Sequence, residues 1–355
     1  MIRAFFLASL VAVALGLGAA ILDTEAADDS TTIVASAAPA PVTPAASGLP
    51  ARPIVVYHES WDERDVTKPA ATTLAVMPAY MNVVMLSFVK PDLIYAGHLD
   101  ISETGLQYKF SGEILRQSIA LLHQRHPQTK VLLSVGSDAY LNWDALDSDA
   151  VANLVHDLGA DGVDIDYEPK DPVCGLGGDG EVACMTDSTW TQIVHRLRAV
   201  LPRPAILTVT GWNVGAFGEG QWVKAKPKSD YTGIMLSLFR SPEAKDIDLV
   251  SVMAYDGGPE YDPYQAYLAY RHVFKGPMAV GVQVPPSPQG GPNYTVAMTE
   301  TLVSKVAQDP LAGAMLYPVL GVPNGTVTPD NPDARLLGQA ICRSLKVEDC
   351  TTTLP

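Results

Sequence analysis

One short stretch, residues 161–168, places three carboxylates at alternating positions in a run that otherwise has the composition of a buried strand. Because residues two apart on a strand share a face, Asp164, Asp166 and Glu168 lie on one face and the apolar side chains on the other. Neighbouring carboxylates on that face are about 6 to 7 Å apart, and at an effective dielectric constant near 20 each ionised pair costs about 2.5 kcal/mol. We therefore expect the three groups to titrate together and one of them to keep a proton near neutral pH, as a general acid must.

Two other interpretations of this stretch are a calcium site and an exposed strand face. Calcium loops carry their ligands on a glycine-rich turn, and a solvated strand would alternate its acids with Lys, Thr or Ser rather than with Val and Ile. Carboxylates clustered on a buried element are costly to keep without a function. The stretch therefore favours a catalytic site.

Around this stretch the chain alternates short β-branched runs with segments of helical periodicity, which is typical of an α/β domain. Eight such units predict a single catalytic domain folded as a closed (β/α)8 TIM barrel, in which sites lie at the carboxyl ends of the strands. Glu168, Asp256 and Tyr317 fall at such ends. The predicted strands are residues 54–58, 82–88, 130–135, 161–168, 205–210, 248–255, 277–284 and 312–318.

The two ends of the chain are expected to lie outside this barrel. Residues 1–20 have the charged start, apolar run and small-residue cleavage site of a secretory signal peptide, for which a retained membrane anchor is the alternative. Residues 21–51 are rich in Ala, Pro and Thr, which predicts a disordered linker, and residues 346–355 form a C-terminal tail. The catalytic barrel therefore spans residues 52–345, and we expect the protein to be secreted.

Charge and cysteine content narrow the possible partners. Lys and Arg total 24 against 39 Asp and Glu, a net charge of -15, which argues against nucleic acid, anionic membranes and polyanionic substrates. Four cysteines in a secreted chain predict two disulfides, and proximity in the sequence favours Cys174 with Cys184 and Cys342 with Cys350. Neither pair has the spacing of a metal site. We expect a monomer that acts on a neutral substrate, with no metal, no cofactor and no membrane contact once the signal is removed.

Three motifs resemble those of glycoside hydrolase family 18, the family of chitinases and related endo-N-acetylglucosaminidases. The octet at 161–168 is the most specific of them. Ser-Val-Gly at 134–136 is similar to the family's Ser-x-Gly-Gly, and Met-Ala-Tyr-Asp at 253–256 is similar to its Met-x-Tyr-Asp. The resemblance implies a chitinase-like hydrolase built on a TIM barrel.

The resemblance also implies a mechanism, a retaining hydrolysis in which the 2-acetamido group of the substrate is the nucleophile. Glu168 would protonate the glycosidic oxygen, and Asp166 would orient the acetamido nitrogen and stabilise the oxazolinium ion. Asp164 would share a proton with Asp166, and Tyr255 would hydrogen-bond the acetamido carbonyl. The residues expected to contact the substrate are Asp256, Tyr317, Tyr57, Met253 and Trp212.

The chain departs from the family pattern at three strands. At the third strand Ser137 stands where the second Gly of the family's motif is usual. Tyr317 stands at the eighth strand, where the family usually has a tryptophan beneath the sugar, and the seventh strand lacks the usual Tyr-Gly-Arg. Only residues 285–311 separate these strands, which leaves no room for the α+β subdomain that some chitinases insert there. We therefore expect an open cleft that suits endo-acting, internal cleavage.

Three functions fit these features. The first is a hydrolase of β-1,4-linked N-acetylglucosamine polymers, chitin or chito-oligosaccharides, and the motif at 253–256 favours it. The second is an endo-β-N-acetylglucosaminidase acting on N-glycans, which shares the same carboxylates. The third, a non-catalytic chitin-binding relative, is disfavoured because Glu168 is present.

Overall fold

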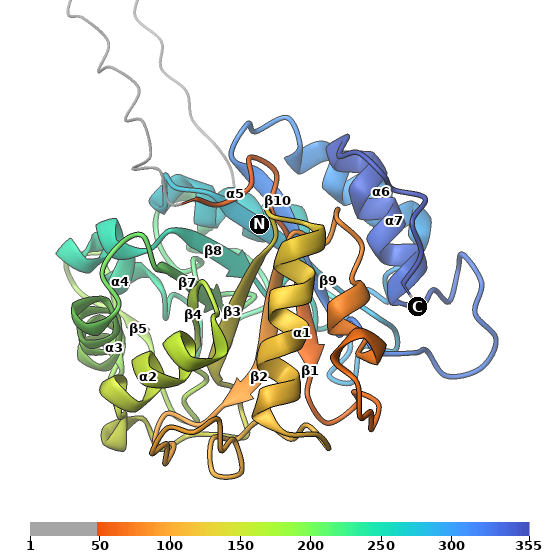
Figure 1. Cartoon of the computed structure of the whole chain (residues 1–355). Coiled ribbons are helices and arrows are strands. Elements are labelled where there is room, and N and C mark those ends of the chain that lie inside the picture. The colour runs from red at the N-terminus through yellow and green to blue at the C-terminus, as the bar shows by residue number, and fades with distance from the viewer. Residues whose placement is uncertain (1–47, 355) are drawn as a thin grey trace, which may run out of the picture. The chain divides into compact units, whose positions relative to one another are not determined.

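The structure, a computed structural model, describes residues 48–354 and contains a closed barrel of parallel strands (Figure 1). The strands run β1-β10-β9-β8-β7-β4-β3-β2 around the barrel, and every neighbouring pair is parallel. The (β/α)8 barrel predicted from the sequence is confirmed. Its strands are β1 Ile54–Glu59, β2 Val83–Val89, β3 Lys130–Gly136, β4 Gly162–Asp166, β7 Ile206–Gly211, β8 Leu249–Val252, β9 Met278–Gln283 and β10 Ala312–Tyr317.

Helices surround the barrel, with α2, α3 and α4 on one side of Figure 1 and α6 and α7 on the other. Between β1 and β2 the structure has two short 3₁₀ helices, Pro69–Ala71 and Leu74–Val76, instead of an α-helix. Helical periodicity at residues 112–123 and 151–158, from about 188 and after 332 predicts α1, α2, α3 and α7, and no such pattern was identified for α4, α5 and α6. The α-helices are α1 Gly112–Arg125, α2 Ser148–Leu158, α3 Asp187–Val200, α4 Leu236–Arg240, α5 Pro263–Val273, α6 Val296–Val306 and α7 Ala334–Leu345.

Side-chain caps determine where several of these helices begin. The Asp147 side chain accepts a hydrogen bond from a backbone N–H in the first turn of α2, and Asp333 does the same for α7. Gly159 ends α2 in the left-handed conformation that glycine adopts without strain. These caps fix the lengths of the helices that cover the barrel.

The barrel strands are covered on both faces, which explains their nearly continuous apolar sequences. Every residue of β2, β4 and β9 is buried. Because β4 is buried throughout, its two aspartates, Asp164 and Asp166, are carried into the interior of the protein. Their surroundings therefore decide their charge.

The segment between β9 and β10 contains α6, and no α+β subdomain lies there among the described residues. A short antiparallel hairpin, β5 Gly175–Leu176 and β6 Val182–Ala183, follows β4 and was not predicted. It lies inside the loop closed by the disulfide between Cys174 and Cys184, whose Cα atoms are 4.1 Å apart. That pairing is the one predicted from the sequence.

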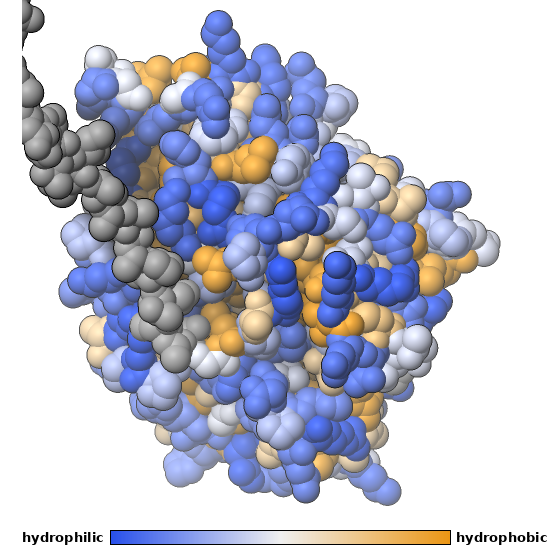
Figure 2. Space-filling model, turned by 90° about the horizontal axis from the view of Figure 1, so that it is seen from above, coloured by the Kyte–Doolittle hydropathy of each residue, from blue (hydrophilic) through white to orange (hydrophobic). Residues whose placement is uncertain are grey.

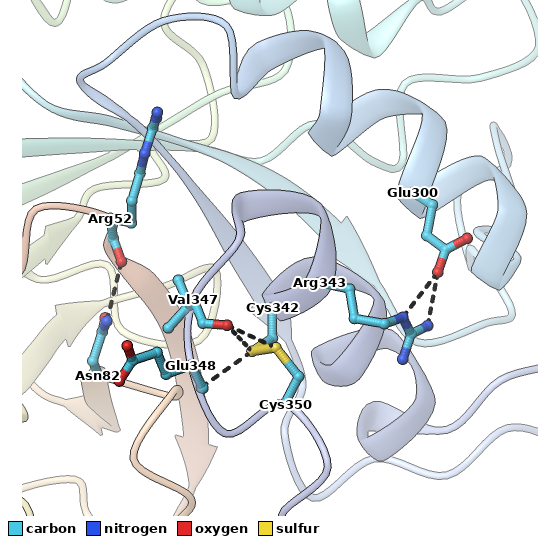
Figure 3. The surroundings of a disulfide bond; sticks show 8 residues. All are labelled: Arg52, Asn82, Glu300, Cys342, Arg343, Val347, Glu348 and Cys350. Atoms are coloured by element: carbon cyan, nitrogen blue, oxygen red, sulfur yellow. Dashed lines mark hydrogen bonds and ion pairs between the residues drawn. A yellow bond between two sulfur atoms is a disulfide. The ribbon is translucent and has the colours of Figure 1, made fainter.

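The predicted C-terminal tail packs against the barrel domain. The second predicted disulfide joins Cys342 in α7 to Cys350 (Figure 3). Val347 and Leu354, within the predicted tail, pack against the core. Beside the disulfide, Arg343 of α7 forms an ion pair of 2.7 Å with Glu300 of α6, which holds the last two helices together (Figure 3).

The predicted signal peptide and residues 21–47 of the predicted linker lie outside the described residues. Within residues 48–354, no helix has both the length and the apolar character needed to cross a bilayer. On the face of the molecule shown in Figure 2, most side chains are hydrophilic and the hydrophobic ones form small scattered groups. Scattered exposure of apolar side chains is ordinary for a folded domain.

At Gly162 the backbone of β7 leaves no room for a side chain on β4, which provides a test of the fold. A Cβ atom at this position would lie 1.9 Å from the carbonyl oxygen of Ile206, its partner in the strand pairing. Neither backbone can shift without losing the register of the barrel. We therefore predict that Gly162→Ala lowers the free energy of unfolding by about 3 kcal/mol or more, measured by denaturant titration.

Gly178 provides the matched control for this substitution. A Cβ atom there would have no neighbour within 4 Å. Gly178→Ala should change the free energy of unfolding by less than about 0.5 kcal/mol. Equal effects of the two substitutions would contradict the close pairing of β4 with β7.

Candidate active site

A cavity of about 220 Å³ lies at the carboxyl ends of the barrel strands. Four carboxylates line it, and no Lys, Arg or His side chain is among its lining residues. Asp164 was predicted to act in catalysis but does not line the cavity. The predicted residues that do line it are Tyr57, Asp166, Glu168, Trp212, Met253, Tyr255, Asp256 and Tyr317.

Asp164 is fully buried and is surrounded by hydroxyl groups. It accepts hydrogen bonds from Tyr57 at 2.9 Å, Ser134 at 2.8 Å, Thr208 at 2.6 Å and Thr210 at 3.1 Å. Burial raises the pKa of Asp164 above its ordinary value, and the four hydroxyl donors offset part of that rise. Asp164 is thus a fixed acceptor at the centre of a network that joins β1, β3 and β7 to β4.

Two expectations for this region stay predictions. Tyr57 was expected to contact the substrate; it lines the cavity, its side chain is 2% exposed, and its hydroxyl is hydrogen-bonded to Asp164 and Thr210. Asp164 was expected to share a proton with Asp166. Among the described residues no hydrogen bond joins these two carboxyls, and the sharing of a proton stays a prediction.

Asp166 is the last residue of β4 and is buried at the edge of the cavity. Its Oδ1 atom has no hydrogen-bond partner among the described residues. Burial raises the pKa of Asp166 well above its ordinary value, and the negative charges of Glu168, Asp164 and Asp138 raise it further. Burial and the neighbouring negative charges therefore both oppose the ionised form of Asp166.

Glu168 lies two residues beyond β4 and is partly exposed to the cavity. Burial raises the pKa of Glu168 to about 7, the charge of Asp138 contributes to the rise, and the backbone N–H of Asp138 opposes it. An acid with this pKa holds a proton at neutral pH and releases it readily. Glu168 thus has the property that a general acid requires.

Aromatic side chains form one side of the cavity. The rings of Tyr255 and Tyr317 stack with centroids 6.0 Å apart and planes 14° apart. Among the described residues, the hydroxyl of Tyr255 donates one hydrogen bond, to the sulfur of Met315 at 3.8 Å, and because thioether sulfur is a weak acceptor a ligand oxygen can replace it. Elsewhere on the wall Trp212 stacks on Tyr231 at 3.8 Å, and the half-buried Met253 also lines the cavity.

The chain is similar to known proteins over much of its length. The model of the family "Glycosyl hydrolases family 18" matches residues 53–273, which is more than half of the chain. The chain belongs to glycosyl hydrolase family 18. A chitinase of Plasmodium falciparum (isolate 3D7) is 30% identical over 200 residues, which cover 51% of this chain and 50% of that protein, so this chain spans about half the length of the curated relative it matches.

Solved structures of the family have the same fold. A family 18 chitinase from Chromobacterium violaceum matches with a TM-score of 0.56 and 16% identity, covering 85% of this chain and 86% of that one. Human YKL-39, described as a pseudo-chitinase with retained chitooligosaccharide binding, matches with a TM-score of 0.56 and 15% identity, covering 83% of this chain and 100% of that one. At these identities the likeness shows the fold alone.

Asp138 is a site residue of this family 18 chain that sequence reasoning missed. It is exposed, lines the cavity and raises the pKa of Glu168. It follows Gly136 and Ser137, whose φ angles of 113° and 83° turn the chain over the carboxyl end of β3. The available signal was its position two residues after the Ser-x-Gly motif at 134–136, where an acid is placed at the mouth of the barrel.

The part of the chain that the structure describes contains no ready set of metal ligands. No group of three or more His, Cys, Asp or Glu side chains there is arranged to hold a metal ion. The carboxylates that line the cavity instead face a space bordered by aromatic rings. This arrangement suits a neutral ligand that carries hydrogen-bond donors.

The charge of Asp138 predicts a specific pH dependence. If Glu168 acts as a general acid, turnover falls as the pH rises through its pKa of about 7, because the proton is lost. Asp138→Asn removes a charge that raises this pKa, so the alkaline limb of the kcat/KM profile should move to lower pH. Asp65→Asn removes the same charge from an exposed position outside the cavity and should leave the limb in place. An unmoved limb in Asp138→Asn would refute the coupling.

Proposed function

We propose that the chain is a secreted glycoside hydrolase that cleaves β-1,4-linked N-acetylglucosamine polymers internally and retains the anomeric configuration. The observation that carries the proposal is the pair formed by Glu168, with its pKa of about 7, and the buried Asp166, whose Oδ1 lacks a partner among the described residues. This pair lies in the cavity of a family 18 chain. The matched relative named a chitinase supports the choice of substrate.

In the first step Glu168 gives its proton to the glycosidic oxygen. The carbonyl oxygen of the substrate's 2-acetamido group attacks the anomeric carbon as the bond to the leaving oxygen breaks, and an oxazolinium ion forms. Asp166 accepts a hydrogen bond from the acetamido N–H and balances the developing positive charge. The hydroxyl of Tyr255, which otherwise donates to the sulfur of Met315, donates to the acetamido carbonyl and holds it beneath the anomeric carbon.

In the second step Glu168, now a carboxylate, takes a proton from water. The hydroxide that this creates bonds to the anomeric carbon and opens the oxazolinium ring, which restores the acetamido group. Glu168 ends the cycle protonated, as it began. Two inversions at one carbon give a product with the starting β-configuration.

Secretion and a monomeric state are parts of the proposal. Two disulfides support an oxidising compartment, since such bonds form and persist outside the reducing cytosol. The net charge of -15 favours a soluble chain that repels its own copies.

Product analysis tests this function directly. We expect the chain to convert chitohexaose into shorter oligosaccharides, with cleavage at internal bonds, and to leave a high-mannose glycoprotein intact. Proton NMR of early product should show the β-anomer first. Release of glycan from the glycoprotein would favour the endoglycosidase, and early α-anomer would exclude the retaining mechanism.

The acetamido group supplies a control for the mechanism. A fully deacetylated chitosan oligomer lacks the nucleophile, so it should be inert although its ammonium groups are attracted to this acidic protein. A thiazoline analogue of the oxazolinium intermediate should inhibit, because it has the shape and charge that the site stabilises. Hydrolysis of a glucan without acetamido groups at a rate equal to that of chitohexaose would contradict the mechanism.

Glu168→Gln tests the role of the acid itself. The substitution keeps the shape of the side chain but removes the transferable proton, so turnover should fall by roughly 10²-fold to 10⁴-fold while chito-oligosaccharide binding, measured by calorimetry, stays close to wild type. Glu103→Gln makes the same change on an exposed side chain outside the cavity and should have full activity. A Glu168→Gln protein with more than about a tenth of wild-type turnover would not fit a general acid.

A further inference from the structure

Gln283, the last residue of β9, is a buried polar side chain in the wall of the cavity. Its Nε2 atom donates a hydrogen bond to Oδ2 of Asp256 at 3.1 Å. Its Oε1 atom is buried and has no donor among the described residues. One half of this amide is therefore paired within the protein and the other half is not.

Asp256 determines which way the Gln283 amide points. An ionised carboxylate accepts hydrogen bonds and donates none, so only the NH₂ group of Gln283 is stable against it. In the reversed orientation the carbonyl oxygen of Gln283 would face the carboxylate of Asp256, so two acceptors would meet. The NH₂ group of Gln283 would then lose its hydrogen bond to Asp256. The carbonyl of Gln283 is thus held as an acceptor on the side away from Asp256.

Asp256 also holds the neighbouring part of the wall. Its Oδ1 atom accepts hydrogen bonds from the hydroxyl of Ser287 and from the backbone N–H of Gln289, the latter at 3.3 Å. Pro288 and Gln289 line the cavity. Asp256 has a φ of 52°, a conformation that is strained for a residue other than glycine and that its surroundings must maintain. Asp256 lines the cavity, so its predicted contact with a sugar stays a prediction, and its carboxylate is also hydrogen-bonded to the wall.

We propose that Gln283 is a specificity-determining residue whose carbonyl oxygen accepts a hydrogen bond from a hydroxyl group of the saccharide, and that Asp256 is the positioning residue that fixes this carbonyl. The inference rests on the proposed function, because the saccharide is the ligand of the same cavity. A buried acceptor without a donor is costly in the free protein, and a ligand that brings the donor removes that cost. Such a site discriminates against an analogue that lacks the donor.

The rest of the cavity favours the same kind of ligand. Asp138, Asp166, Glu168 and Asp256 add further acceptors to its lining, and no cationic side chain is present there. A saccharide, whose hydroxyl and acetamido N–H groups are donors, complements this set. A ligand rich in anionic groups does not.

The test combines one variant with a set of altered substrates. We would measure kcat/KM for a chito-oligosaccharide and for analogues that each lack one hydroxyl, in the wild type and in Gln283→Leu, which has a similar volume and no amide. In the wild type one analogue should lose at least about tenfold relative to the parent. In Gln283→Leu the parent should lose a similar factor, and the difference between the parent and that analogue should disappear.

Two further variants support this test. Asp256→Asn places an amide beside Gln283, so either orientation of the Gln283 side chain finds a partner, and discrimination against the critical analogue should weaken. Gln117→Leu makes the same chemical change on α1, outside the cavity, and should leave all the ratios unchanged. Thermal unfolding checks that each variant is folded, and Asp256→Asn provides the test if Gln283→Leu is not.

The proposal is overturned if Gln283→Leu keeps the kcat/KM of the parent, or if every analogue loses the same factor in the wild type and in the variant. The second result would mean that the carbonyl is not paired by a hydroxyl of the substrate. A wild type that does not hydrolyse the parent would overturn the proposed function instead. In that case calorimetric binding of the same analogues to Gln283→Leu and wild type tests the assignment of Gln283 without any turnover.

Discussion

The site depends on the hydrogen bonds that bury Asp164. Four hydroxyl groups converge on this carboxyl, and they come from β1, β3 and β7, which flank or approach β4 in the barrel. They make a buried acid tolerable, because each lone pair that leaves water finds a donor. The charge of Asp164 then acts on Asp166, two residues along the strand, and raises its pKa. The barrel fold, which holds Asp164 in place, therefore affects the pKa of Asp166.

The sequence predicted those parts of the fold that follow a local pattern. Apolar strand runs and the helical periodicity of α1, α2, α3 and α7 were sufficient to predict a barrel. α4 has five residues, Leu236–Arg240, and is too short for its periodicity to be recognised. β8 was predicted over 248–255 but ends at Val252, because the chain turns toward Asp256, whose φ is positive. Apolar content continues past that turn, so the end of the strand is not visible in the sequence.

Site residues that follow a local sequence pattern could be predicted, and those that only the fold brings together could not. Asp164, Asp166 and Glu168 alternate along one strand, and that spacing is visible without a structure. Asp138 and Gln283 belong to other strands or loops and act only because the closed barrel brings them to the same cavity. Nothing in the neighbourhood of Gln283 in the sequence distinguishes it from a core residue of β9. Its significance comes from Asp256, which is 27 positions away along the chain.

The proton affinities fit a nucleophile that belongs to the substrate. An enzyme that attacks the sugar with its own carboxylate needs that carboxylate ionised before the reaction, beside a second acid that is still protonated. Here burial and neighbouring negative charges oppose the ionised form of Asp166, so it is poorly suited to such an attack. An oxazolinium ion formed from the substrate would carry positive charge next to Asp166, and an adjacent positive charge lowers the pKa of an acid. Under the proposed function, Asp166 passes its proton to the neighbouring Asp164, with which it is predicted to share one, as the oxazolinium ion forms, and the resulting Asp166 carboxylate supplies the counter-charge.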